Sequence, residues 1–168
     1  MWQYVVASVV CACFTTTAPA AITGTWVSPF FSTSPSKLQE NWPAIEAASI
    51  KYDVDVRLLS ALIIAESNGN NNALNSESSA CMMQVVSGER IKGRPLAKEL
   101  TSSVDLCLKW GLQVYTAYRE RLGGNDCKAI TAYNRGVNWV KRNGYKTKFF
   151  KRVSDVYKEL WGEQLKCQ

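Results

Sequence analysis

Glu66 is the side chain of this sequence that is best suited to acid–base chemistry. It closes an apolar run, residues 58–65, and a loop of Ser, Asn and Gly follows at once. At helical spacing Leu59, Leu62 and Ile63 share its face, which removes its carboxylate partly from water. Glu66 also lies at the negative end of the helix dipole. Both effects raise its pKa, and a carboxylic acid that is protonated near neutral pH can serve as a general acid.

The absence of histidine narrows the chemistry further. None of the 168 residues is His. Ser-His and Cys-His nucleophiles and the common His-containing zinc sites are therefore excluded. The cysteines form no close CxxC pair, so no metal site is expected, and no other cofactor is predicted. Proton transfer must come from Glu, Asp, Lys, Tyr or Cys, which favours Glu66.

Two further segments combine with Glu66-Ser67 into a pattern. They are Cys81-Met82-Met83-Gln84 and Ala132-Tyr133-Asn134-Arg135-Gly136. In this order and at this spacing, the three segments resemble the soluble lytic transglycosylase family, which has a goose-type lysozyme-like fold. The family's pattern is Glu-Ser, a loop with Ala and Ser, Gly-Leu-Met-Gln, Ala-Tyr-Asn-Ala-Gly, and a Tyr on the last helix. The similarity covers about residues 50–160.

The resemblance implies a role for each matched residue. Glu66 matches the catalytic acid/base. Met83 and Gln84 match a Met-Gln pair whose side chains border the sugar cleft, and Tyr133 and Asn134 match a Tyr-Asn pair that faces the catalytic Glu. The residues that the resemblance assigns to substrate binding are Ser67, Asn75, Met83, Gln84, Tyr133, Asn134 and Phe149.

The sequence also departs from the family's pattern at several positions. Cys81 and Met82 stand where the family has Gly and Leu, Asn75 where it has Ser, and Arg135 where it has Ala. Phe149 aligns best with the final Tyr and lacks that hydroxyl, which Tyr145 could supply by a different route. These departures leave the acid in place and change the hydrogen bonds around it.

The resemblance implies a reaction that one carboxylate can perform. Glu66 protonates the glycosidic oxygen between N-acetylmuramic acid and N-acetylglucosamine, and then takes the proton of the muramoyl 6-hydroxyl, which gives a 1,6-anhydro product. One alternative is a lysozyme-type hydrolase, in which Glu77 supplies the second carboxylate that such enzymes need. The other is a catalytically weak peptidoglycan-binding subunit of an assembly.

The apolar periodicity predicts a mainly α chain without a convincing strand. A lysozyme-like single domain with a substrate cleft is expected over residues 37–168. The expected helices are 37–51 capped by Ser36, one capped by Asp53 or Asp55 that carries Glu66, a short one around 80–88, 104–121, one capped by Asp126 that includes Tyr133, and 147–161.

The N-terminal residues indicate export. Residues 1–20 contain an apolar stretch too short to span a bilayer and a small-residue cleavage site, which predicts a signal peptide, with an uncleaved membrane anchor as the alternative. Residues 21–36 are rich in Ser, Thr and Pro and read as an extended arm. A periplasmic or envelope-associated protein is expected, of the small type that accompanies secretion or conjugation systems.

Four cysteines remain beyond the predicted signal peptide, which suggests two disulfides. Cys107 and Cys127 are expected near opposite ends of one helix, too far apart to bridge. Two connectivities stay open: Cys81–Cys107 with Cys127–Cys167, or Cys81–Cys127 with Cys107–Cys167.

The formal net charge of +6 favours a polyanionic partner such as an acidic cell-wall polymer. Basic residues cluster loosely between Lys141 and Arg152, but no nucleic-acid-binding motif accompanies them, so nucleic acid is not an expected partner. The predicted partners are peptidoglycan glycan strands and components of an envelope-spanning apparatus.

Overall fold

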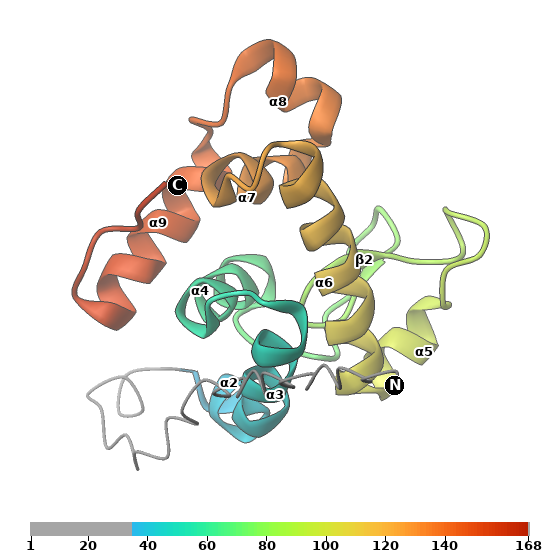
Figure 1. Ribbon diagram of the computed structural model, residues 1–168. Helices are drawn as coiled ribbons and strands as arrows, with labels where there is room; N and C mark the ends of the chain where they lie inside the picture. The colour runs from blue at the N-terminus through green and yellow to red at the C-terminus, as the bar shows by residue number, and fades with distance from the viewer. Residues whose placement is uncertain (1–34, 168) are drawn as a thin grey trace, which may run out of the picture.

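The computed structural model describes residues 35–167, and its helices surround a central helix, α4 (Figure 1). The mainly α prediction is confirmed. The signal peptide over residues 1–20 and nearly all of the arm over residues 21–36 lie outside the described residues and stay predictions. The elements are α2 (Ser36–Glu40), α3 (Trp42–Tyr52), α4 (Val56–Ser67), β1 (Ser79–Ala80), β2 (Val85–Val86), α5 (Ala97–Ser102), α6 (Val104–Arg121), α7 (Asp126–Arg135), α8 (Val137–Asn143) and α9 (Lys148–Trp161).

Helix α4 is apolar on nearly every side, and this composition explains its central position. Its first turn is capped by the Asp55 carboxylate, which accepts a hydrogen bond from the Arg57 N–H at 2.8 Å. Its buried residues are Leu58, Leu59, Ser60, Ala61, Leu62, Ile63 and Ala65. Helix α9 packs most extensively against it, and α3 also contacts it. Glu66 and Ser67 are its last two residues, and Asn68 ends it with a φ of 57°.

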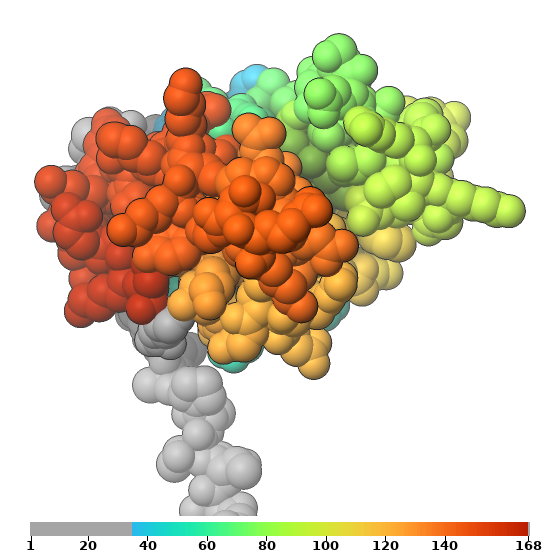
Figure 2. All heavy atoms as spheres, turned by 90° about the horizontal axis from the view of Figure 1, so that it is seen from above, coloured from blue at the N-terminus to red at the C-terminus, as the bar shows by residue number. Residues whose placement is uncertain are grey.

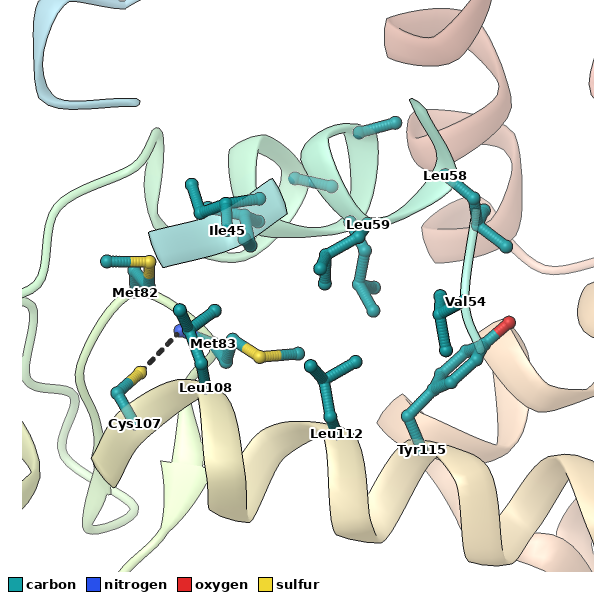
Figure 3. Packing of buried hydrophobic residues seen from close by; sticks show 14 of the residues in the cluster. Ile45, Val54, Leu58, Leu59, Met82, Met83, Cys107, Leu108, Leu112 and Tyr115 are labelled. Atoms are coloured by element: carbon teal, nitrogen blue, oxygen red, sulfur yellow. Dashed lines mark hydrogen bonds between the residues drawn. The ribbon is translucent and has the colours of Figure 1, made fainter. Parts of the chain in front are cut away.

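The hydrophobic core fills the space between α3, α4 and α6 (Figure 3). Ile45 from α3, Leu59 from α4 and Leu112 from α6 are buried there. Met83 also enters this core, and its side chain packs over Gly111 of α6, where an added Cβ would come within 2.9 Å of the Met83 Cβ. The core therefore extends from the central helices to the segment that carries Met83.

The short helix expected around residues 80–88 is wrong. Strands β1 and β2 pair antiparallel there, with Ser79 opposite Val86 and Ala80 opposite Val85. The connecting turn, residues 81–84, contains two positive φ angles, 66° at Cys81 and 50° at Gln84. A right-handed helix excludes such angles, so the apolar spacing of this segment reflects burial in a turn.

Smaller details of the helices also differ from expectation. The helix predicted over 37–51 is divided into α2 and α3 at Asn41, and Ser36 does not cap it, since Pro35 holds that position. Asn125, and not Asp126, caps α7: its side-chain oxygen accepts from the Lys128 N–H at 2.9 Å. Helix α5 was not predicted, because its six residues are too few for a periodic pattern.

The two disulfides follow the first of the open connectivities, Cys81–Cys107 and Cys127–Cys167. Cys107 and Cys127 lie on different helices, α6 and α7, and not on one helix as expected. The first disulfide fastens the 81–84 turn to α6, and the second fastens α7 to the C-terminal tail. Within residues 35–167 no helix is long and apolar enough to cross a membrane.

Candidate active site

Glu66 is half-buried at the C-terminal end of α4. Burial is the largest influence on its carboxyl group and raises its pKa from 4.5 to about 7. The positive charge of Arg152 on α9 opposes this rise in part. A carboxyl group with such a pKa exchanges its proton readily near neutral pH, as a residue that serves alternately as acid and base requires.

Tyr133 on α7 is electrostatically coupled to Glu66. Burial raises the pKa of its phenol well above the usual value, and the negative charge of Glu66 raises it further. Its hydroxyl donates a hydrogen bond of 2.8 Å to the backbone carbonyl oxygen of Met83. Tyr133 therefore stays a neutral hydrogen-bond donor beside the acid, fixed in place by the 81–84 turn.

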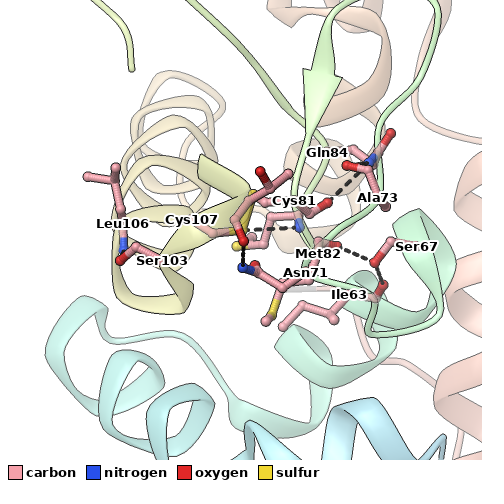
Figure 4. The surroundings of a disulfide bond; sticks show 12 residues. Ile63, Ser67, Asn71, Ala73, Cys81, Met82, Gln84, Ser103, Leu106 and Cys107 are labelled. Atoms are coloured by element: carbon pink, nitrogen blue, oxygen red, sulfur yellow. Dashed lines mark hydrogen bonds between the residues drawn. A yellow bond between two sulfur atoms is a disulfide. The ribbon is translucent and has the colours of Figure 1, made fainter. Parts of the chain in front are cut away.

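Three of the expected site residues, Ser67, Gln84 and Tyr133, meet at the 81–84 turn, and Figure 4 shows the first two of them. The Ser67 hydroxyl donates to the carbonyl oxygen of Met82 at 2.8 Å, and so joins the end of α4 to the turn. The Gln84 side-chain amide donates to the Cys81 carbonyl oxygen at 3.0 Å. Together with the bond from Tyr133, these contacts satisfy three consecutive carbonyl groups, at positions 81, 82 and 83. The turn is thus held from α4 and α7 at once, next to Glu66.

The position of the Met83 side chain differs from the one that the resemblance implies. Its side chain is completely buried in the core, whereas the resemblance places it at the border of the sugar cleft (Figure 3). Its contribution to the site is its carbonyl group, which accepts from Tyr133. The apolar environment between α4 and α6 accounts for the difference, since an unbranched Met fills irregular space in a core.

The other expected substrate-binding residues lie at the surface or at its edge. Asn75 is exposed, and its side-chain oxygen accepts from the backbone N–H groups of Glu77 and Ser79, which shapes the loop before β1. Asn134 is exposed near the end of α7. Phe149 is half-buried in the first turn of α9 and packs on the core. Their contacts with substrate stay predictions.

The aromatic ring of Tyr145 is in contact with another aromatic ring. It packs edge-on against Phe150, with ring centroids 5.0 Å apart. Its carbonyl oxygen accepts from the Thr131 hydroxyl at 2.6 Å, which fastens the segment before α9 to α7. Tyr145 therefore supports the position of α9, and a role for its hydroxyl in place of the missing one at Phe149 stays a prediction.

Two acidic residues follow Glu66 in the sequence: Glu77, the second carboxylate of the hydrolase alternative, and Glu89. Glu77 is exposed and its carboxylate lies 3.9 Å from the Arg90 guanidinium. The Glu89 carboxylate accepts from the Ala97 N–H at 3.0 Å and so caps the start of α5. Within residues 35–167, no carboxylate contributes to the pKa shift of Glu66. Two carboxylates close enough to share a glycosidic bond would raise the pKa of one another.

Arg152 belongs to this site, although the sequence did not identify it as a site residue. It is exposed on α9, one residue before the fully buried Val153. A signal existed, because Arg152 follows Phe149 by three residues and so shares its side of the helix. Its significance depends on the packing of α9 against α4, which the sequence does not state.

Two hollows of the described surface lie elsewhere. One of about 530 Å³ is at the opposite end of α4, lined by Asp55, Arg57 and Tyr157 among others. One of about 470 Å³ lies between α3 and α6, beside Ala48 and Leu108. Neither contains Glu66, so the substrate cleft at Glu66 stays a prediction.

The fold places this chain in a known structural class. It is similar to a solved structure of the lytic transglycosylase Slt from Pseudomonas aeruginosa, an inactive mutant, with a TM-score of 0.54 and 17% sequence identity. The match covers 71% of this chain and 22% of that one, so this chain corresponds to about a fifth of the larger protein. Because the sequence identity is only 17%, this structural similarity shows the fold alone, which is the expected lysozyme-like fold.

The sequence pattern described as "Transglycosylase SLT domain" matches residues 43–155, more than half of the chain. The chain therefore belongs to the transglycosylase SLT domain family, as its motifs had indicated. No curated protein matches it.

Proposed function

We propose that this protein is a peptidoglycan lytic transglycosylase in which Glu66 alone carries both proton transfers. The observation that carries the proposal is the half-buried Glu66 at the end of α4, with a pKa of about 7, beside the neutral hydroxyl of Tyr133. Membership of the SLT domain family supports the choice of substrate.

The reaction consumes no water, because the two products together contain all the atoms of the substrate and no others. Protonated Glu66 gives its proton to the glycosidic oxygen, the bond from that oxygen to the muramoyl C1 breaks, and N-acetylglucosamine leaves with a new hydroxyl. The Glu66 carboxylate then takes the proton of the muramoyl 6-hydroxyl while this oxygen bonds to C1, and Glu66 returns to its starting state. The muramoyl N-acetyl group stabilises the cation-like intermediate between the two steps.

The surroundings of Glu66 support one carboxylate over two. A retaining or inverting hydrolase needs a second carboxylate within about 5–9.5 Å of the first. Among the described residues the charge that acts on Glu66 is that of Arg152, and Glu77 is paired with Arg90 in the exposed loop. The 1,6-anhydro product requires the internal hydroxyl as nucleophile, and no second acid.

Mass spectrometry of the fragments released from purified peptidoglycan tests the proposal. Wild-type protein is expected to give 1,6-anhydromuramoyl ends, and Glu66→Gln to lose about 10²–10⁴-fold in rate while keeping its fold. Because the first step needs protonated Glu66, kcat/KM of wild type should fall above pH 7.

Glu77→Gln is the matched control, because it removes an exposed carboxylate of the same kind. It is expected to leave the rate unchanged. Reducing ends in the product together with an inactive Glu77→Gln variant would establish the hydrolase. Equal release by wild type and Glu66→Gln would exclude both enzymes and favour the binding subunit.

We further propose that the protein acts in the periplasm or at the envelope, where it opens the wall for a secretion or conjugation apparatus. The predicted signal peptide and the two disulfides support an exported protein. Fusion of residues 1–30 to a periplasm-dependent reporter tests the export, and a reporter that stays in the cytoplasm would exclude it.

A further inference from the structure

Residues 127–154, which we call the basic segment, have a larger net positive charge than the whole protein. The segment contains eight Lys and Arg residues and no Asp or Glu. All eight are exposed: Lys128, Arg135, Lys141, Arg142, Lys146, Lys148, Lys151 and Arg152. Since the whole chain has a net charge of only +6, the other residues together are slightly acidic. The charge is thus concentrated on one part of the surface.

The basic segment lies directly beside the proposed active site. It includes Tyr133, whose pKa responds to the charge of Glu66, and Arg152, whose charge acts on Glu66 from α9. Figure 2 shows one face of the molecule, on which α8 and the start of α9, in orange, gather beside the green and yellow-green segments that follow α4. The net positive charge of these elements therefore favours the approach of an anionic polymer to this part of the surface.

Arg152 differs from its neighbour Lys151 in having no hydrogen-bond or ion-pair partner among the residues that the structure describes. The Lys151 ammonium forms an ion pair of 2.6 Å with Asp155 one turn further along α9. The Arg152 guanidinium makes no hydrogen bond or ion pair with any residue between 35 and 167. Its side chain is exposed, while Val153 anchors the same turn of α9 in the core. An exposed guanidinium is thus carried by the helix that packs most extensively on α4, and its charge acts on Glu66 at the end of α4.

We propose that Arg152 is a specificity residue that pairs with a carboxylate carried by the muramoyl unit of the substrate. The inference rests on the proposed function. The guanidinium fork suits a planar carboxylate, which it can bind through two parallel hydrogen bonds. Two sources share this chemistry: the free lactyl carboxylate of a glycan without peptides, and the carboxylates of a peptide attached to the lactyl group.

Such pairing would also act on Glu66. The positive charge of Arg152 favours the ionised form of Glu66 and lowers its pKa. When a substrate carboxylate neutralises that charge, the protonated form of Glu66 is favoured instead. Of the charged and titratable side chains that act on Glu66, Arg152 comes from α9 and Tyr133 from α7. Substrate binding would therefore prepare the acid for the first step.

The test compares three soluble glycan strands of equal length. The first carries peptides, the second is stripped of peptides and exposes lactyl carboxylates, and the third has those carboxylates converted to neutral methylamides. Wild type, Arg152→Gln and Arg152→Lys are assayed on each for kcat and KM. Lys158→Gln is the control, because it removes another exposed cation from the far end of α9.

We expect Arg152→Gln to lose about tenfold or more in kcat/KM, mainly through KM, on at least one charged glycan relative to the neutral one. The charged glycan that shows the loss identifies the source of the carboxylate. Arg152→Lys should recover part of it, and Lys158→Gln should show none. On the neutral glycan, Arg152→Gln should move the falling limb of the pH profile to higher pH, which a merely structural role would not do.

Equal losses on charged and neutral glycans, or no loss on any, would overturn the inference. Equilibrium binding of the same glycans, which needs no turnover, decides it separately from the proposed function. If wild type binds charged glycans more tightly through Arg152 but releases no anhydro ends, the inference stands and the proposed reaction fails. If anhydro ends appear but Arg152→Gln binds all three glycans as wild type does, the inference fails alone.

Discussion

The hydroxyl of Tyr133 donates a hydrogen bond of 2.8 Å to the backbone carbonyl oxygen of Met83, fifty residues away in the sequence. This bond joins α7 to the 81–84 turn, while Ser67 joins the end of α4 to the same turn. The turn therefore sets the position of Tyr133 relative to Glu66, although it contributes no proton to the proposed reaction.

Tyr133→Phe should lower both stability and activity. It removes the donor and leaves the Met83 carbonyl without its partner, which should cost about 1–2 kcal/mol in the free energy of unfolding. Urea unfolding measures the cost, and release of anhydro ends measures the activity. Tyr118→Phe is the control, because the Tyr118 hydroxyl makes no hydrogen bond with a described residue. Equal effects of the two substitutions would contradict a special role for the bond to Met83.

Gly111→Ala should destabilise the protein, although alanine is the better helix former by about 1 kcal/mol. A Cβ at this position of α6 would come within 2.9 Å of the Met83 Cβ, and the Met83 side chain is fully buried and cannot withdraw into solvent. We expect a net loss of about 1–3 kcal/mol in thermal or urea unfolding. Gln113→Ala, at an exposed position of the same helix, should be close to neutral. A stabilised Gly111→Ala variant would show that the turn can move away from α6.

The stability of the protein should depend on the protonation of Glu66. Its pKa is about 7 in the folded chain and 4.5 ordinarily, so the folded state binds the proton more tightly. The resulting stabilisation is complete below about pH 4.5 and is lost as the pH rises through about 7. The Glu66→Gln variant has no carboxyl group to ionise at this position, so its stability does not fall in this way as the pH rises. Its free energy of unfolding should therefore rise relative to wild type between pH 4.5 and 7, by on the order of 2 kcal/mol. A difference that does not change with pH would contradict the burial of Glu66.

The backbone conformation at Cys81 predicts that two double variants without the Cys81–Cys107 disulfide differ in stability. Removing the Cys81–Cys107 disulfide should cost about 3–4 kcal/mol in either case, since it closes a loop of 26 residues. Cys81 has a φ of 66°, which glycine adopts freely and alanine does not. Cys81→Gly with Cys107→Ala should thus be about 1 kcal/mol more stable than Cys81→Ala with Cys107→Ala. Urea unfolding of both variants decides the point, and equal stabilities would count against it.

Sequence periodicity was sufficient for the long helices. The apolar spacing of α4, α6 and α9 defined them. The cap at Asp55 was one of two predicted alternatives, and the raised pKa of Glu66 was predicted, because both features depend on neighbours within one or two turns. The same reasoning failed at residues 81–84. Apolar residues there suggested a helix, whereas the left-handed backbone at Cys81 and Gln84 is imposed by contacts with α4, α6 and α7.

The site residues also fall into two groups, those that the sequence motifs predicted and those that depend on packing between distant segments. Glu66, Ser67, Gln84 and Tyr133 gather around one turn, as the order of their motifs suggested. Whether the Met83 side chain faces the core or the surface, and whether Arg152 reaches Glu66, depends on how α9 and α6 pack on α4. Such packing between segments far apart in the chain leaves no local signal in the sequence.

The positive φ of Cys81 explains how this chain departs from the Gly-Leu-Met-Gln pattern without losing the turn. A position that ordinarily calls for glycine has accepted a larger side chain together with a covalent partner 26 residues later. Searches that require glycine at the first position of this motif will pass over chains of this kind. A pattern that allows either glycine, or cysteine paired with a second cysteine at the start of the following long helix, would retrieve both forms and show how often the exchange has occurred.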